Sequence, residues 1–293
     1  MAKVSRIASI YKVLLGLICL ALLLPAAWPA RAADSVFRPL RSYLIRQGLP
    51  VRQVDALLNA PGVRFEARLL ARLLARPEHK LNYRQFLSKK VVKRARRFKQ
   101  RHRKDLRESQ RLTGVEPEVV VAILTVESGL GAYTGRWSTF NVLASQAVLD
   151  TKAARKRLAR KWPKKQLKEL YSAKMRARLA RRAAWARGEI MSLLELARQQ
   201  GVSPLALRGS VAGALGMCQF VPSSVLKHGR DGDANGRLEL HKPADAIASV
   251  GWYLKHYGWR PGMSRDEKIV VLLTYNNSRT YARTVLDLAR RLR

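Results

Sequence analysis

The sequence predicts a mainly α-helical protein, and three observations support this fold class. Apolar residues recur at steps of three and four over most of the chain, which is the spacing of one face of an α-helix. Glycine and proline stand between these stretches, where they end one helix and begin the next. Because no convincing series of alternating apolar and polar residues is present, we expect any sheet to be confined to a small hairpin.

The first part of the chain is predicted to form short helices joined by tight turns. Apolar residues keep helical spacing from Phe37 to Leu44, from Val54 to Leu58 and from Leu69 to Leu74. The turns Gly48-Leu49-Pro50 and Ala60-Pro61-Gly62 separate these three segments. We divide the whole chain into a leader at 1–33, an N-terminal helical region at 34–110 packed on the core, and a region at 111–293 that carries the candidate functional residues.

A helix over Glu118 to Val126 carries the first candidate for chemistry. Pro117 suits the first turn of this helix, and the run from Val119 to Leu124 is apolar on all sides, so the helix should be buried. Glu127 follows at its end. Burial disfavours a charged carboxylate and raises its pKa, which suits a general acid near neutral pH. By itself this signal is weak, because a glutamate at a helix end more often pairs with an arginine.

The remaining elements also read as helices. Two very basic segments, Lys89 to Arg107 and Lys152 to Arg187, are mainly helical, and Pro163 should break the second. The other helices are expected over Asn141 to Leu149, Ala183 to Gln200, Ala244 to Tyr257, Arg265 to Thr274 and Thr280 to Arg291.

The first 33 residues have the pattern of a cleaved secretory signal peptide. Basic residues precede the apolar run Val13 to Leu24, and Ala30-Arg31-Ala32 offers small residues at a cleavage site. The apolar run is shorter than the roughly 20 residues that span a bilayer. Since Ile18 precedes Cys19, a lipid-modified cysteine is disfavoured, and after cleavage Cys218 has no partner for an internal disulfide. We expect a soluble periplasmic protein, with an uncleaved membrane anchor as the alternative.

The formal net charge of +37 requires a reason. Lys89 to Arg107 holds eleven basic residues against Asp105, and Lys152 to Arg187 holds fifteen against Glu169. Such a charge is typical of proteins that bind nucleic acid, but an exported chain rarely meets it. Attraction to an anionic surface of the cell envelope and a plain solvated surface remain as two explanations.

Three ordered motifs resemble the family of membrane-bound lytic transglycosylase B. They are Val126-Glu127-Ser128-Gly129-Leu130-Gly131, the segment from Gly209 to Ser224 that contains Gly216-Met217-Cys218-Gln219-Phe220, and Tyr275-Asn276-Asn277-Ser278. The similarity extends from about Phe37 to the C-terminus and is strongest from Ser210 to Tyr281. This resemblance implies a lysozyme-like helical core with extra helices, and peptidoglycan glycan strands as the substrate.

The resemblance also implies which residues form the site. Glu127 matches the single catalytic glutamate of the family, which acts first as acid and then as base. It protonates the oxygen between N-acetylmuramic acid and N-acetylglucosamine and then deprotonates the muramyl 6-hydroxyl, which closes on C1 to give a 1,6-anhydro end. Six further positions match groups that line the glycan groove, and their amides, hydroxyls and aromatic faces suit sugars: Ser210, Gln219, Tyr253, Tyr275, Asn276 and Tyr281.

Two other functions compete with this interpretation. Most glycosidases use two carboxylates, and a hydrolytic muramidase would need Asp150 or another acid to approach Glu127. A non-catalytic peptidoglycan-binding protein would keep the groove without turnover. We expect the transglycosylase, acting as a monomer without an organic cofactor or nucleic acid.

A calcium loop is predicted between the second and third motifs. Asp231, Asp233 and Asn235 place oxygen ligands at the first, third and fifth positions of an EF-hand-like loop, with Gly236 at the turn. Lys242 occupies the twelfth position, where a bidentate glutamate is usual. The resembling family closes its loop with an acid fourteen residues after the first ligand, where this chain has Asp245. Arg237 would contribute its backbone carbonyl. We expect a structural Ca²⁺, against the alternative of a simple polar turn.

Overall fold

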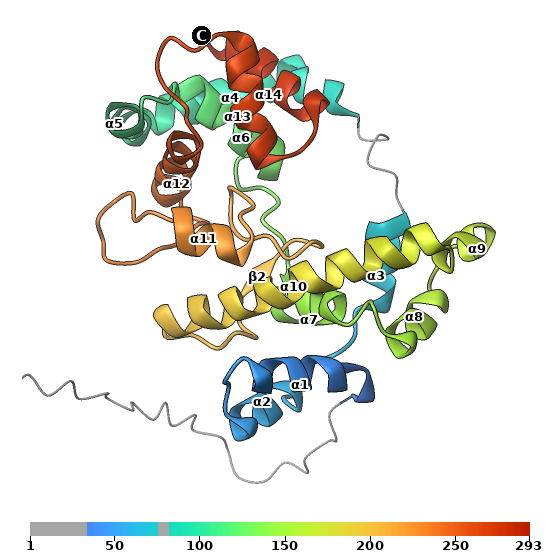
Figure 1. The fold of residues 1–293 in the computed structure, drawn as a ribbon. Coiled ribbons are helices and arrows are strands. Elements are labelled where there is room, and N and C mark those ends of the chain that lie inside the picture. Colours follow the sequence, from blue (N-terminus) through green and yellow to red (C-terminus); the bar gives the residue numbers. More distant parts are fainter. Residues whose placement is uncertain (1–33, 76–81) are drawn as a thin grey trace, which may run out of the picture. The chain divides into compact units, whose positions relative to one another are not determined.

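The computed structural model describes residues 34–75 and 82–293, and these are mainly α-helical, as the sequence predicts (Figure 1). The described residues form one compact unit. The predicted signal peptide lies outside the described residues. Within the described part of the chain, every helix is too short or too polar to cross a membrane. The division at residue 110 stays a prediction.

The N-terminal helices pack on the middle of the chain. Their apolar faces bury residues such as Leu40 and Leu44 in a core cluster that also contains Phe140 and Ile190. Gly48, at a φ of 90°, ends the first of them, since the amide of Leu49 then reaches back to the carbonyl of Leu44. The elements are η1 (Ser35–Phe37), α1 (Arg38–Arg46), α2 (Val51–Leu58) and α3 (Ala67–Ala75).

The first basic segment is helical, as predicted, and divides into two helices. After η3 (Tyr83–Leu87), α4 (Lys89–Arg101) ends at His102 and α5 (Arg103–Thr113) continues to Gly114. Ala95 and Phe98 of α4 are buried, and the basic residues occupy its remaining faces. Both helices pack against α6 (Pro117–Ser128).

Helix α6 is the central helix of the larger core cluster. Proline stands at its first turn, and the residues from Val119 to Leu124 are all buried, as predicted. Helices α4, α5, α12 and α14 surround it. The helix ends at Ser128, so Glu127 lies in its last turn and not beyond it.

The second basic segment breaks near Pro163, as predicted, but its last helix is longer than expected. We expected a helix from Ala183, whereas α10 begins at Ala173, because the Ser172 hydroxyl caps it by accepting from the amide of Met175. Figure 1 shows α7 beside this long helix, and the two pack together. The bounds are α7 (Thr139–Ala147), α8 (Lys152–Ala159), η4 (Lys164–Gln166), α9 (Leu167–Leu170) and α10 (Ala173–Gln199).

The small sheet is not the local hairpin that we expected. It pairs β1 (Trp137–Ser138) with β2 (Arg208–Gly209) in antiparallel register, so it joins two segments that are far apart in the sequence. The acidic loop from Asp231 to Asp245 contains no strand. Tertiary pairing of this kind leaves no local turn signal, which is why the sequence could not place it.

The C-terminal helices complete the larger core cluster. Ser264 and Glu267 form a reciprocal capping box at the start of α13. Tyr281, in the first turn of the last helix, is buried against this cluster. The four helices are α11 (Pro222–His228), α12 (Pro243–His256), α13 (Arg265–Tyr275) and α14 (Arg279–Leu292). The bounds of α12, α13 and α14 lie within one residue of the predicted ones, and α11 had no predicted bounds.

Candidate functional site

Glu127 lies in the last turn of α6, where the backbone turns sharply away. Gly129 has a φ of 59° and closes the helix, with its amide donating to the carbonyl of Thr125 at 3.1 Å. Leu130 shares this left-handed conformation at a φ of 59°, which costs a residue with a side chain about 1 kcal/mol. The strained turn leaves Glu127 half-buried at the edge of the core and removes any side chain at Gly129.

Burial raises the pKa of Glu127 to about 7. Loss of solvation is the main cause, and a hydrogen bond from Tyr281 opposes it by stabilising the charged form. Within the described residues, Glu127 forms no salt bridge, so no arginine neutralises it. Near neutral pH this carboxyl is therefore partly protonated, as a general acid requires.

Three tyrosines predicted for the site lie together beside Glu127. The Tyr281 hydroxyl donates to Oε1 of Glu127 at 2.7 Å. The ring of Tyr275 stacks on that of Tyr281 at 6.4 Å, and Tyr253 meets Tyr275 edge-on at 4.8 Å. Burial raises the pKa of all three tyrosines, so they stay neutral. Tyr253 and Tyr281 are buried, so their rings belong to the core next to the site and not to an open surface.

Gln219 and Ser210 lie on the segment that follows β2, which contacts this tyrosine cluster at Cys218. Gln219 is half-buried at a φ of 52°, and its side-chain amide donates to the carbonyls of Gly216 and Thr134. The neighbouring carbonyl of Cys218 accepts a 2.6 Å hydrogen bond from the Tyr275 hydroxyl. Ser210 accepts from two amides of its own turn. Both side chains thus fix the loop.

A close backbone crossing sets the position of this loop. Gly135, at a φ of 94°, lies so near Gly209 that a Cβ would stand 2.1 Å from the carbonyl carbon and oxygen of Gly209. In turn, a Cβ on Gly209 would stand 2.4 Å from the carbonyl oxygen of Ala214. The segment after Glu127 and the segment before Ser210 can therefore approach only because both positions are glycine.

Asn276 differs from the other predicted site residues because it is exposed. It follows Tyr275 directly, and its backbone ends α13. The sequence missed Tyr83, whose ring lies edge-on to Tyr281 at 6.5 Å, and Phe220, which packs on Tyr253 and Tyr275. Phe220 stands inside the second motif, whereas nothing in the sequence pointed to Tyr83.

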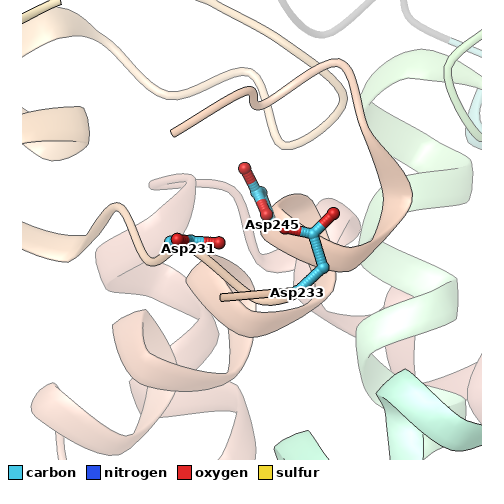
Figure 2. Close-up of side chains that lie close together, drawn as sticks. All are labelled: Asp231, Asp233 and Asp245. Atoms are coloured by element: carbon cyan, nitrogen blue, oxygen red, sulfur yellow. The ribbon is translucent and has the colours of Figure 1, made fainter. Parts of the chain in front are cut away.

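The acidic loop brings three carboxylates to one point. Figure 2 shows Asp231, Asp233 and Asp245 turned toward a common space, and their oxygens lie within 4.8 Å of one another. Asp245 is buried at the start of α12 and accepts from the amides of Gly232 and Glu239. Burial raises the pKa of Asp245, and the charges of the other two carboxylates raise it further.

This arrangement fits a hard divalent cation. Oxygen ligands at about 2.3 to 2.6 Å from Ca²⁺ lie at most about 5 Å apart, which matches the spacing of the three carboxylates. A cation would also relieve the repulsion that raises the pKa of Asp245. The Asn235 side-chain oxygen accepts from the amide of Arg237 and so helps to fold the loop. As ligands, Asn235 and Arg237 remain predictions.

Asp150 is paired with an arginine and does not contribute to the raised pKa of Glu127. Its carboxylate accepts a 2.5 Å hydrogen bond from Arg187 of α10. No carboxylate contributes to the raised pKa of Glu127, as a neighbouring negative charge would. Among the described residues, Glu127 therefore stands without a carboxylate partner.

Comparisons with known proteins agree with this geometry. Residues 32–272 match the family described as "Transglycosylase SLT domain". Membrane-bound lytic murein transglycosylase B of Escherichia coli is 35% identical over 149 residues, which cover 51% of this chain and 33% of that protein. The match thus spans about a third of the length of that curated relative.

Two solved structures share the fold. Soluble lytic transglycosylase SltB1 of Pseudomonas aeruginosa superposes with a TM-score of 0.69 at 24% identity, covering 88% of this chain and 98% of that one. The Escherichia coli lytic transglycosylase SLT35 in complex with calcium gives a TM-score of 0.68 at 21% identity, covering 88% and 93%. The predicted lysozyme-like helical fold is confirmed.

Proposed function

The chain belongs to the transglycosylase SLT domain family, and we propose that it is a lytic transglycosylase that cleaves peptidoglycan glycan strands. The bond cleaved is the β-1,4 bond between N-acetylmuramic acid and N-acetylglucosamine, and the product carries a 1,6-anhydromuramyl end. The observation that carries this proposal is the half-buried Glu127, whose pKa is raised to about 7.

In the proposed reaction Glu127 acts alone, first as acid and then as base. The protonated carboxyl gives its proton to the glycosidic oxygen as the bond to C1 breaks. The resulting carboxylate then takes the proton of the muramyl 6-hydroxyl, whose oxygen attacks C1. A pKa near 7 supports both steps, because the proton is neither held too tightly nor lost before the substrate binds.

The surrounding groups support this exchange. Tyr281 donates to the carboxylate form of Glu127 and so lowers the cost of the charged state between the two steps. Tyr275 and Tyr253 hold Tyr281 in place from behind. Ser210, Gln219 and Asn276 are less buried than Tyr253 and Tyr281, and we assign them to contacts with the sugars.

In the part of the chain that the structure describes, no second acid accompanies Glu127, and this favours the proposed reaction over hydrolysis. A retaining hydrolase holds its carboxyl groups about 5 Å apart, and an inverting one about 6.5 to 9.5 Å apart. Asp150 is instead paired with Arg187. With no carboxylate of the described residues beside Glu127 to activate water, the substrate's own 6-hydroxyl is the available nucleophile.

Calcium is proposed as a structural ion of the acidic loop. Asp231, Asp233 and Asp245 would hold it through side-chain oxygens, with Asn235 and the carbonyl of Arg237 completing the set. The ion would join the loop to the start of α12, which carries Tyr253 of the site. It has no step in the reaction, and no organic cofactor is required.

The proposed location is the periplasm, reached through a cleaved signal peptide. Peptidoglycan is there, and the basic surface would favour residence near anionic polymers of the envelope. The protein is proposed to act as a monomer and not to bind nucleic acid.

Digestion of purified sacculi tests the function directly. Mass spectrometry of the soluble fragments should find 1,6-anhydromuramyl ends. Reducing ends in their place would make the protein a hydrolytic muramidase. Binding of sacculi without released fragments would make it a non-catalytic binding protein.

A further inference from the structure

Arg94 of α4 lies at the edge of the Glu127 turn. Its Nη2 atom stands 3.1 Å from the position that a Cβ on Gly129 would occupy, and a ring carbon of Tyr133 stands 3.5 Å from the same point. Gly129 is only two residues beyond Glu127, and both Arg94 and Tyr133 are exposed, Tyr133 by 78%. A guanidinium and an aromatic ring therefore border the surface beside the catalytic carboxyl.

Within the described residues Arg94 has no hydrogen bond and no ion pair. Two other cations of α4 are engaged, since Lys99 pairs with Glu118 and Arg96 donates to the carbonyl of Arg291. Eight of the 13 residues of α4 are Lys or Arg, and none is acidic. Arg94 is thus an unneutralised charge in a positive field, which favours an anion at this point.

The proposed substrate brings an anion to this position. The muramyl sugar whose C1 reacts at Glu127 carries a peptide, and that peptide has free carboxylates. Arginine is the side chain best suited to them, because its planar guanidinium binds a carboxylate through two parallel hydrogen bonds. Gly129, without a side chain, leaves the approach to the guanidinium open.

We infer that Arg94 forms a carboxylate-binding subsite for the peptide carried by the muramyl sugar at Glu127. The inference rests on the proposed function and adds a residue that selects strands bearing peptides over bare glycan. Arg94 binds without quenching the acid, since its charge is not among the causes that set the pKa of Glu127.

The experiment compares two substrates with three variants. The substrates are glycan strands with their peptides and strands from which an amidase has removed them. Arg94→Gln should lower kcat/KM about 5- to 10-fold on peptide-bearing strands and leave it unchanged on bare strands. Arg94→Lys should recover part of the loss. The matched control Arg101→Gln removes the same charge from an exposed arginine two turns along α4 and should match the wild type on both substrates.

Several results would overturn the inference. Equal losses on both substrates would make Arg94 a structural or glycan contact, and equal losses in Arg101→Gln would make the effect one of general charge. A shift in the pH profile of Arg94→Gln would mean that the arginine acts through Glu127. Arg94→Lys keeps the charge but cannot form two parallel hydrogen bonds with a carboxylate. If Arg94→Gln proves unstable, a substrate preference in Arg94→Lys equal to that of the wild type would also count against the subsite. Wild-type protein inactive on both substrates would instead refute the proposed function.

Discussion

The Tyr281 hydroxyl donates a 2.7 Å hydrogen bond to Oε1 of Glu127 and so ties the first turn of α14 to the last turn of α6. Tyr281 and Glu127 are 154 residues apart in the sequence. This bond favours the charged carboxylate, while the surrounding core favours the neutral acid. The pKa of about 7 is the balance of these two effects.

Tyr281→Phe should therefore move the pH dependence of the enzyme. Removing the hydroxyl removes the group that lowers the pKa of Glu127, so this pKa should rise above about 7. The protonated acid would then persist to higher pH, and the alkaline limb of kcat/KM should shift upward. A kcat/KM profile measured on glycan strands from pH 5 to 9 checks this.

Tyr171→Phe is the matched control, because Tyr171 is exposed by 48% and lies at the end of α9. Its profile should coincide with that of the wild type. A downward shift of the alkaline limb in Tyr281→Phe would contradict the assigned direction of the hydrogen bond.

Glu127→Gln should abolish turnover and yet stabilise the protein above neutral pH. Loss of the acid should lower kcat by about 10³-fold or more. The folded pKa of Glu127 is raised from 4.5 to about 7, so the stability it contributes is complete below pH 4.5 and is lost as the pH rises through 7. The neutral amide avoids this loss, and the variant should gain up to about 3 kcal/mol at pH 8 but nothing at pH 4. Chemical denaturation at the two pH values measures it.

Glu195→Gln provides the contrast, since Arg198 and Gln199 hold the pKa of Glu195 down at about 2. This change should give no gain in stability at pH 8. A Glu127→Gln variant that is no more stable than the wild type at pH 8 would argue that the carboxyl is better solvated than the structure implies.

Calcium should raise the melting temperature through Asp245. A ligand at 100 times its Kd stabilises the folded state by about 2.7 kcal/mol. Calorimetry with and without a chelator should therefore show a clear shift in wild-type protein and none in Asp245→Asn. Asp266→Asn, a change of the same type at an exposed position in α13, should keep the shift. Equal melting temperatures with and without Ca²⁺ in wild-type protein would leave the loop as a polar turn.

The sequence predicted most of the helices because their signals are local. In α6, for example, the signals lie within one short stretch: Pro117 starts the helix, an apolar run follows, and Gly129 ends it. Helix α10 was predicted too short because its start depends on the cap at Ser172, which lies in a stretch dominated by basic residues. The pairing of β1 with β2 has no local signal at all.

The site residues, like the helices, could be predicted from the sequence only in part. Glu127 and Tyr281 could be proposed from motifs, but the hydrogen bond between them arises only when α14 packs on α6. The raised pKa of Glu127 was expected from the apolar helix alone, since burial is its main cause. Tyr83 and Arg94 were missed because they belong to no motif and reach the site through tertiary packing.

The glycine crossing gives the last prediction, which separates backbone strain from steric exclusion. Gly135 and Gly48 have nearly the same φ, 94° and 90°, but a Cβ at Gly135 would stand 2.1 Å from Gly209, whereas a Cβ at Gly48 meets nothing within 4 Å. Gly48→Ala should cost only the strain of the left-handed conformation, about 1 kcal/mol, and leave kcat/KM unchanged. Gly135→Ala should cost about 3 kcal/mol or more, because the whole backbone segment before Ser210 must move. That displacement should also lower kcat/KM in the molecules that remain folded. Similar stability losses in the two variants would mean that the crossing has room to relax, and that the loop bearing Gln219 is not held by it.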